Sequence, residues 1–369
     1  MRDRTERPVG NAHAHRVRML NIGLLWACLI WPWLGNSVAA QGFAGLGTEA
    51  QDYAQVTPDV ALTFPRDHLA HPGFRIEWWY VTANLVAADG TEMGLQWTLF
   101  RQAGAPGDTA QGWQSAQVWM GHAAVTTPDA HYVAERFARG GIGQAGVSGS
   151  PFVAWIDDWE LAGDSFDDRL RLSASGDGFS YAVELQAQGP LVLHGEQGVS
   201  VKSSGGQASY YYSQPNFALE GTVMLGAQTH TVTGRAWLDR EWSSQPLSGT
   251  QSGWDWFALH LPEGEKLMMF RLRDAEAGHY TSGTWIASDG EPTPLENGAA
   301  RFEPLATSQV EGRAIPTRWR LQLPERGLDI TTEAVNDQSY MTTAFPYWEG
   351  PIRFSGSHSG VGYLEMTGY

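Results

Sequence analysis

One kind of segment occurs twice in this chain, an aromatic stretch followed by a turn and a second stretch that ends in Arg. The first copy spans residues 77–101 and turns at Asp89-Gly90. The second copy spans residues 253–271 and turns at 262–264. Two similar hairpins about 170 residues apart predict two copies of one β domain, and a closed sheet is a common architecture for a domain of this size.

Strand patterns continue from Ile76 to the C-terminus, and period-two alternation is clear over 319–323. The best helix candidate is 128–139, which Gly140-Gly141 would end. We therefore expect an all-β pair of antiparallel barrels with minor short helices.

The expected organisation has four parts. They are an export signal at 1–40, a lead-in arm at 41–62, a first β domain at 63–232 and a second β domain at 233–369. The limit between the domains is placed near a strand that Gly226 and Gly234 flank, since such a strand could close one barrel and lead into the next.

The N-terminus has the features of a secretory signal peptide. Five Arg within the first eighteen residues precede an apolar run over 19–34, and Val38-Ala39-Ala40 offers small residues for cleavage. Pro32 breaks the apolar run, which is too short for a membrane span. We expect the mature protein to be periplasmic or secreted, with cleavage near Ala40.

Cys28 is the only cysteine of the chain. The alternative to ordinary cleavage is a lipoprotein, in which Cys28 would become the lipidated N-terminus and bring the protein into contact with a membrane. With ordinary cleavage the mature chain has no thiol, so it has neither a disulfide nor a cysteine nucleophile.

The mature chain is strongly acidic. Without the five Arg and two acids of residues 1–40, 19 basic residues face 38 acidic ones, a net charge of −19. Such a surface repels nucleic acid and anionic lipid headgroups. Fourteen of the seventeen Trp remain, and Trp in this number either fills a β core or lines a pocket for an apolar ligand.

Asp239 and Glu241 are the first candidates for catalysis. In an extended segment Trp237, Asp239 and Glu241 share one face, and Arg240 and Trp242 share the other. Two close carboxylates repel each other, which raises the pKa of one and makes it a proton donor. The alternative is an ion-pair network of these acids with Arg that joins the two domains.

The second hairpin offers further candidates. Trp254, Trp256 and His260 share one face, and Asp255 lies on the other. If the first face lines a cavity, His260 lies beneath two indoles. The alternative is that His260 is a core residue whose hydrogen bonds are satisfied.

Asp67, His68, His71 and Glu77 gather just before the first hairpin. Two His and a carboxylate suit zinc, but Pro72 follows His71 and the spacing is not that of a helical zinc motif. We expect these four residues to hold a loop onto a barrel mouth, without a metal. The chain has neither a Gly-rich phosphate loop nor a Gly-x-Ser-x-Gly elbow, which disfavours nucleotide enzymes and α/β-type serine hydrolases.

Several long aromatic motifs resemble the AttH and carotenoid 1,2-hydratase family of paired lipocalin-like domains. The matching segments are 64–68, 77–80, 211–213, 237–242, 253–257 and 362–369. The resemblance implies a calycin-type fold, two lipocalin-like domains in tandem, export from a bacterial cell and an apolar ligand. Members similar to the AttH branch accompany transporter components, and others have been called secreted hydrolases or hydratases.

Two functions remain open. The first is a binding protein for a lipid or isoprenoid, accessory to an ABC-type transporter. The second is a hydratase or a secreted hydrolase that acts on an apolar substrate. Asp239 or Glu241 would be its general acid, and Asp255 or His260 would position the reacting water. No cofactor is expected in either case. The residues expected to bind the ligand are Trp78, Trp79, Tyr211, Trp242, Trp254, Trp256, Arg240 and Arg271.

Overall fold

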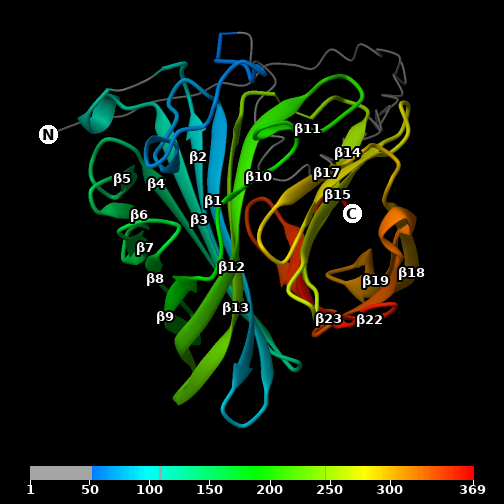
Figure 1. Ribbon diagram of the computed structural model, residues 1–369. Helices are drawn as coiled ribbons and strands as arrows, with labels where there is room; N and C mark the ends of the chain where they lie inside the picture. The colour runs from blue at the N-terminus through cyan, green and yellow to red at the C-terminus, as the bar shows by residue number, and fades with distance from the viewer. Residues whose placement is uncertain (1–51, 108–109, 246) are drawn as a thin grey trace, which may run out of the picture. The chain divides into compact units, whose positions relative to one another are not determined.

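The computed structural model describes residues 52–107, 110–245 and 247–369, and this part of the chain consists mainly of β-strands (Figure 1). The predicted export signal, Cys28 and the first half of the lead-in arm lie outside the described residues. The strands form two large antiparallel sheets, which confirms the all-β prediction of two tandem barrel-like domains.

Thirteen strands form the first sheet, in the order β4-β3-β2-β1-β13-β12-β9-β8-β7-β6-β5, with β10 and β11 paired to β12. Their bounds are β1 Ile76–Ala87, β2 Glu92–Ala103, β3 Gln117–Thr126, β4 His131–Arg139, β5 Ala145–Ser148, β6 Phe152–Ile156, β7 Trp159–Gly163, β8 Arg169–Gly176, β9 Phe179–Ala187, β10 Val192–Leu193, β11 Val199–Val201, β12 Ala208–Leu225 and β13 Gln228–Ser243.

Ten strands form the second sheet, in the order β17-β16-β15-β14-β23-β22-β20-β19-β18, with β21 paired to β22. Their bounds are β14 Gln251–His260, β15 Lys266–Asp274, β16 Tyr280–Ile286, β17 Pro292–Leu295, β18 Arg301–Val310, β19 Arg313–Leu323, β20 Leu328–Ala334, β21 Tyr340–Met341, β22 Tyr347–Gly356 and β23 Gly360–Met366.

The helices of the described residues are three short 3-10 turns. They are η2 Arg66–His68, η3 Gly112–Gln114 and η4 Pro324–Arg326. Within the described ranges, no helix reaches the length and apolarity that crossing a membrane requires.

Both predicted hairpins form, as β1–β2 and as β14–β15. The first turns at Asp89-Gly90, where Gly90 has a φ of +88° that an L side chain rarely adopts. The Asp89 carboxylate accepts a 2.9 Å hydrogen bond from the backbone N–H of Thr91, which stabilises the turn.

The predicted helix at 128–139 is wrong, because His131–Arg139 is strand β4 and pairs along its length with β3. Along the strand inward and outward side chains alternate: Tyr132, Ala134 and Ala138 pack on the core of the first sheet, while Phe137 on the other face is exposed. Pairing with a neighbouring strand and this alternation outweigh the local helix-ending signal of Gly140-Gly141.

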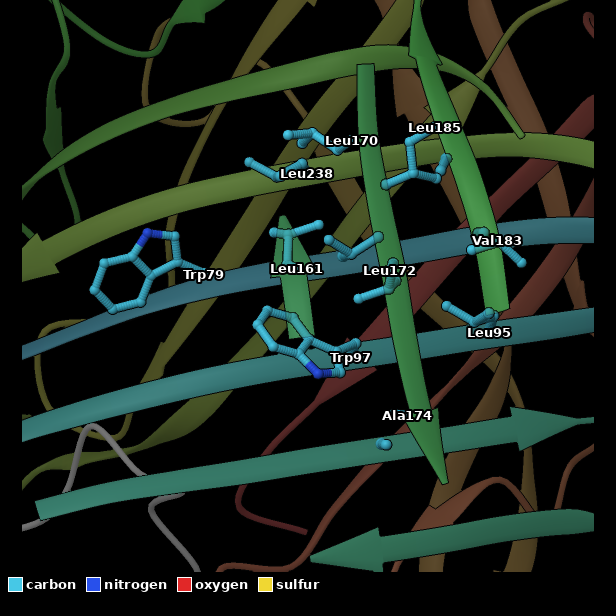
Figure 2. Close-up of a cluster of buried hydrophobic side chains, with 14 of the residues drawn as sticks. Trp79, Leu95, Trp97, Leu161, Leu170, Leu172, Ala174, Val183, Leu185 and Leu238 are labelled. Carbon is cyan, nitrogen blue, oxygen red and sulfur yellow. The ribbon is translucent and has the colours of Figure 1, made fainter. Parts of the chain in front are cut away.

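The inner side of each sheet is filled by apolar side chains. In the first sheet Trp79, Trp97 and Leu161 belong to a buried cluster that Figure 2 shows in close-up. In the second sheet Phe257, Trp319 and Trp348 belong to a comparable cluster. The abundant Trp residues therefore serve to a large extent as core side chains.

The chain leaves the first sheet later than expected. The predicted domain limit between 232 and 233 falls inside β13, which pairs with β1 as far as Ser243 and with β12 as far as Trp242. The second sheet begins at Gln251. We therefore place the limit between Ser243 and Gln251.

Candidate functional site

A cavity of about 150 Å³ lies between the two sheets. Strand β1 contacts β23, and β2 contacts β22, so the outer face of the first sheet meets one face of the second. Aromatic side chains from both sheets line the cavity, and they include Trp78, Phe100, Trp254, Trp256 and Phe270. The walls are therefore mainly apolar.

Asp239 faces this cavity from β13 and is 2% exposed. Its carboxylate accepts hydrogen bonds from the Trp237 indole at 2.6 Å, from the Tyr211 hydroxyl at 2.8 Å and from the Ser213 hydroxyl. Burial raises the pKa of Asp239 to about 7, although these three hydrogen bonds act in the opposite direction. Asp239 can therefore hold or release a proton near neutral pH.

Glu241 lies two residues further along β13 on the same face. Its Oε1 atom accepts a 2.5 Å hydrogen bond from Ser209 and lies 2.9 Å from the Lys202 ammonium. The Lys202 ammonium in turn lies 4.4 Å from the ring centroid of Tyr211 and 4.7 Å from that of Phe270. Lys202 thus brings a positive charge to the cavity wall.

The second sheet carries two neighbouring acids, of which one lines the cavity. Glu349 on β22 and Glu365 on β23 are direct cross-strand partners. Glu365 lines the cavity and accepts a 2.6 Å hydrogen bond from the Trp254 indole. Burial, together with the charges of Asp239 and Glu241, raises the pKa of Glu365 to about 7. Burial also raises the pKa of Glu349, which accepts a hydrogen bond from Tyr80.

Tyr211 connects the two sheets. Its hydroxyl accepts a 3.2 Å hydrogen bond from the Trp256 indole of the second sheet and donates to Asp239 of the first. Tyr211, Trp78, Trp254 and Trp256, all expected to bind the ligand, line the cavity together.

The alternative of an ion-pair network with Arg does not describe the structure, because Glu241 pairs with Lys202 instead and the two Arg residues pair with other acids on the inner faces. Arg240 pairs with Glu77, and Arg271 pairs with Asp255. The guanidinium of Arg240 lies 3.8 Å from the ring centroid of Trp79. Arg240, Arg271, Trp79 and Trp242 therefore do not line the cavity, which corrects their expected role, and the reason is the alternation of side chains along each strand.

Asp255 and His260 are also placed away from the cavity lining. Asp255 points to the inner side of the second sheet, where it forms ion pairs with Arg271 and Arg273. His260 shares the face of Trp256 but lies beside Trp237, with ring centroids 6.0 Å apart. Burial lowers the pKa of His260 to about 3, so it is neutral at physiological pH. Neither residue touches the space in which a ligand would lie.

Asp67, His68 and His71 precede the first strand, and Glu77 lies at the start of β1. Glu77 is buried between Arg101 and Arg240 and accepts a 3.0 Å hydrogen bond from the backbone N–H of His71. The His71 ring stacks on Trp242 with centroids 3.9 Å apart. Asp67 pairs with Arg66 and His71, and His68 bonds to the Tyr212 hydroxyl at 2.7 Å. These contacts fasten the loop to the sheet.

Across the part of the chain that the structure describes, no group of three or more His, Cys, Asp and Glu side chains has the arrangement to hold a metal ion. Glu365 is the cavity-facing acid that sequence reasoning missed. The alternation of Tyr363, Glu365 and Thr367 in the C-terminal aromatic motif was a usable signal, because it places an acid on one face of a strand.

Comparisons with known proteins agree with this architecture. A family model described as AttH-like matches residues 55–369. The crystal structure of a putative AttH from Nitrosomonas europaea superimposes with a TM-score of 0.75 at 31% identity, covering 86% of this chain and 99% of that one.

Two more distant structures share the fold. Kievitone hydratase from Nectria haematococca has a TM-score of 0.64 at 15% identity, over 86% of this chain and 96% of its own. CghA with Sch210972 has a TM-score of 0.51 at 13% identity, over 89% of this chain and 97% of its own. No curated protein sequence matched the chain.

Proposed function

The chain belongs to the AttH-like family, and from this membership and the geometry of the cavity we propose that it binds a small apolar molecule between its sheets and transfers a proton to it through Asp239. The supporting observation is a buried carboxyl group with a pKa of about 7 in a cavity walled by aromatic rings. A proton donor with a pKa near the working pH is the kind that general acid catalysis needs.

The reaction that suits these groups is the addition of water to a double bond. The acid form of Asp239 donates its proton to one alkene carbon, and the π electrons form the new C–H bond. The other carbon becomes a carbocation, which the faces of Trp254 and Trp256 stabilise. Water attacks this carbon and gives up a proton to a carboxylate of the cavity. Hydratase chemistry in a protein of this fold, as the name kievitone hydratase indicates for that neighbour, is consistent with the proposal.

The volume of the cavity limits the ligand. A cavity of about 150 Å³ encloses a molecule of about the size of one aromatic ring. A long isoprenoid would therefore place one end in the cavity. We propose a small alkene, or the alkenyl end of a longer apolar molecule, as the ligand.

The proposal is tested with purified protein and a panel of small aryl and isoprenoid alkenes. Native mass spectrometry and quenching of Trp fluorescence measure binding, and product analysis measures hydration. We expect Asp239→Asn to bind the same ligand and to lose about 100-fold or more of the turnover. Asp164→Asn, a change at an exposed acid, is the matched control and should keep full activity.

Binding without turnover by the wild-type protein would contradict the catalytic part of the proposal. It would leave the protein as a carrier of an apolar molecule, and an ABC-type transporter would then be the partner to test. A cavity that takes up no member of the panel would contradict both parts.

We further propose that residues 1–40 direct export, with Cys28 removed together with the signal. The charged N-terminus and the apolar run that follows it support this proposal.

A further inference from the structure

We propose that Glu365 is a second catalytic carboxyl group, which acts with Asp239 from the opposite wall of the cavity, so that each sheet supplies one acid to the reaction. This inference rests on the proposed function. It assigns a role to a residue of the C-terminal strand, far in sequence from the Asp239 motif.

Two hydrogen bonds and the register of two strands relate the two acids. Asp239 accepts a hydrogen bond from the Tyr211 hydroxyl at 2.8 Å, and this hydroxyl accepts one from the Trp256 indole at 3.2 Å. Trp256 is the direct cross-strand partner of Glu365, so their side chains leave the second sheet on the same face. Both acids line the same cavity.

The two carboxyl groups have matching surroundings. Each accepts a hydrogen bond from an indole N–H at 2.6 Å, Asp239 from Trp237 and Glu365 from Trp254. Among the described residues, neither acid has a Lys, Arg or His nitrogen within 4.0 Å. Without a cation beside it, a buried carboxyl group keeps a pKa that is raised toward neutral pH.

The protonation of Glu365 depends on Asp239. Burial is the largest contribution to its raised pKa, and the charges of Asp239 and Glu241 add to it. Coupling between two charges is reciprocal, so an ionised Glu365 must also oppose ionisation of Asp239. The other charged or titratable groups that line the cavity are Lys202, Glu241, His122 and three Tyr. Glu349 faces Glu365 from the neighbouring strand outside the lining, and the charge of Glu365 raises the pKa of Glu349. Near pH 7 the Asp239–Glu365 pair therefore holds about one proton.

This state provides an acid and a base at the same time. In the form of the pair that the proposed function requires, Asp239 holds this proton and gives it to the alkene carbon, and the Glu365 carboxylate accepts a proton from the attacking water. The alkene gains one H and one OH, while Asp239 ends ionised and Glu365 protonated. Transfer of the proton from Glu365 back to Asp239 through solvent restores the starting state.

Glu349 provides the contrast, because it is an acid on the same face of the neighbouring strand. It is 1% exposed, hydrogen-bonds to Tyr80 and does not belong to the cavity lining. Glu365 keeps part of its surface accessible. Glu349→Gln therefore removes a buried acid next to Glu365 that does not line the cavity, so the acids that a ligand can reach stay in place.

The experiment compares the full-length mature proteins Asp239→Asn, Glu365→Gln and Glu349→Gln with wild type. Infrared spectroscopy of the protonated carboxyl stretch, from pH 4 to 10 and without ligand, measures the titration. In Asp239→Asn we expect the Glu365 midpoint to fall by about one pH unit, and in Glu365→Gln we expect the Asp239 midpoint to fall by a similar amount. Glu349→Gln should keep both coupled steps.

The activity arm uses whichever alkene wild type hydrates. Glu365→Gln should lose about 100-fold in kcat and one limb of the bell-shaped pH profile, while Glu365→Asp should regain part of the activity. Melting curves confirm that each variant is folded. If Glu365→Gln does not fold, Glu365→Asp still tests the role of Glu365.

Two results would overturn the inference. One is a wild-type kcat and pH profile in Glu365→Gln. The other is an Asp239 midpoint that does not move when Glu365 is changed. If wild type turns over no alkene, the proposed function fails, and the ligand-free titration alone still decides whether the two acids share a proton.

Discussion

Glu77 on β1 lies directly opposite Arg101 on β2, and the two form an ion pair buried inside the first sheet. The second hairpin repeats this arrangement with Asp255 opposite Arg271. The hairpins that are similar in sequence thus also carry an equivalent acid and Arg on their inner faces.

Glu77→Gln should destabilise the protein by about 3–5 kcal/mol, because it leaves the buried Arg101 and Arg240 without a counter-charge. Denaturant unfolding at pH 7 measures this loss. Glu184→Gln removes an exposed acid that pairs with Arg169, and it should cost less than about 1 kcal/mol. Equal losses in the two variants would show that the Glu77 network does not stabilise the fold.

Asp239→Asn should change the pH dependence of stability. The pKa of Asp239 is about 7 in the folded protein against 3.8 ordinarily, so folding takes up a proton between these values. The free energy of unfolding of the wild type therefore falls as the pH rises from about 4 to about 7, and this group contributes a loss of roughly 4 kcal/mol. Melting temperatures at pH 5, 6, 7 and 8 should fall less steeply in the variant. An unchanged slope would contradict the raised pKa.

Tyr211→Phe should raise the pKa of Asp239 further, because the hydroxyl donates to the carboxylate and favours its charged form. The lost hydrogen bonds should also cost about 1–2 kcal/mol in stability. The control is Tyr210→Phe, which removes a hydroxyl bonded to the backbone of Thr57. Carboxyl titration by infrared spectroscopy should show a shift in the first variant alone.

Trp254→Phe should raise the pKa of Glu365, since the indole N–H that favours its charged form is removed. Trp155→Phe removes an indole N–H that bonds to the backbone oxygen of Gly143, and it should leave the titration of Glu365 unchanged. The same infrared titration measures both. A Glu365 midpoint that stays in place in Trp254→Phe would argue against this hydrogen bond.

Expression of the full chain in a Gram-negative bacterium should give a mature protein that begins at or near Gln41. N-terminal sequencing of the periplasmic fraction measures this, and Cys28→Ser should be processed in the same way. A mature N-terminus at a lipid-modified Cys28 would establish the lipoprotein alternative instead.

The alternation of residues along the strands could be read from the sequence. Trp237, Asp239 and Glu241 share a face as predicted, and so do Trp254 and Trp256. This succeeds because side chains of a strand point to opposite sides by local geometry alone. The helix expected at 128–139 failed, since pairing with β3 depends on residues outside that segment.

The sequence of a single strand does not show which part of the protein each of its faces packs against. Alternation placed Arg240 and Trp242 on one face, but it did not show that this face packs on the core of the first sheet. It also did not show that the opposite face forms a cavity together with the second sheet. Nor did it show that Glu365 lies in the same cavity as Asp239, because these residues are 126 positions apart.

The sequence by itself determined two related β domains, the two faces of their strands, and which acids and Trp share a face, because these follow from local periodicity and repetition. The tertiary structure decided where the cavity lies and which acids enter it. Those depend on how two sheets, formed by pairing between distant segments, pack against each other, and burial at that contact raises the pKa of Asp239 and of Glu365.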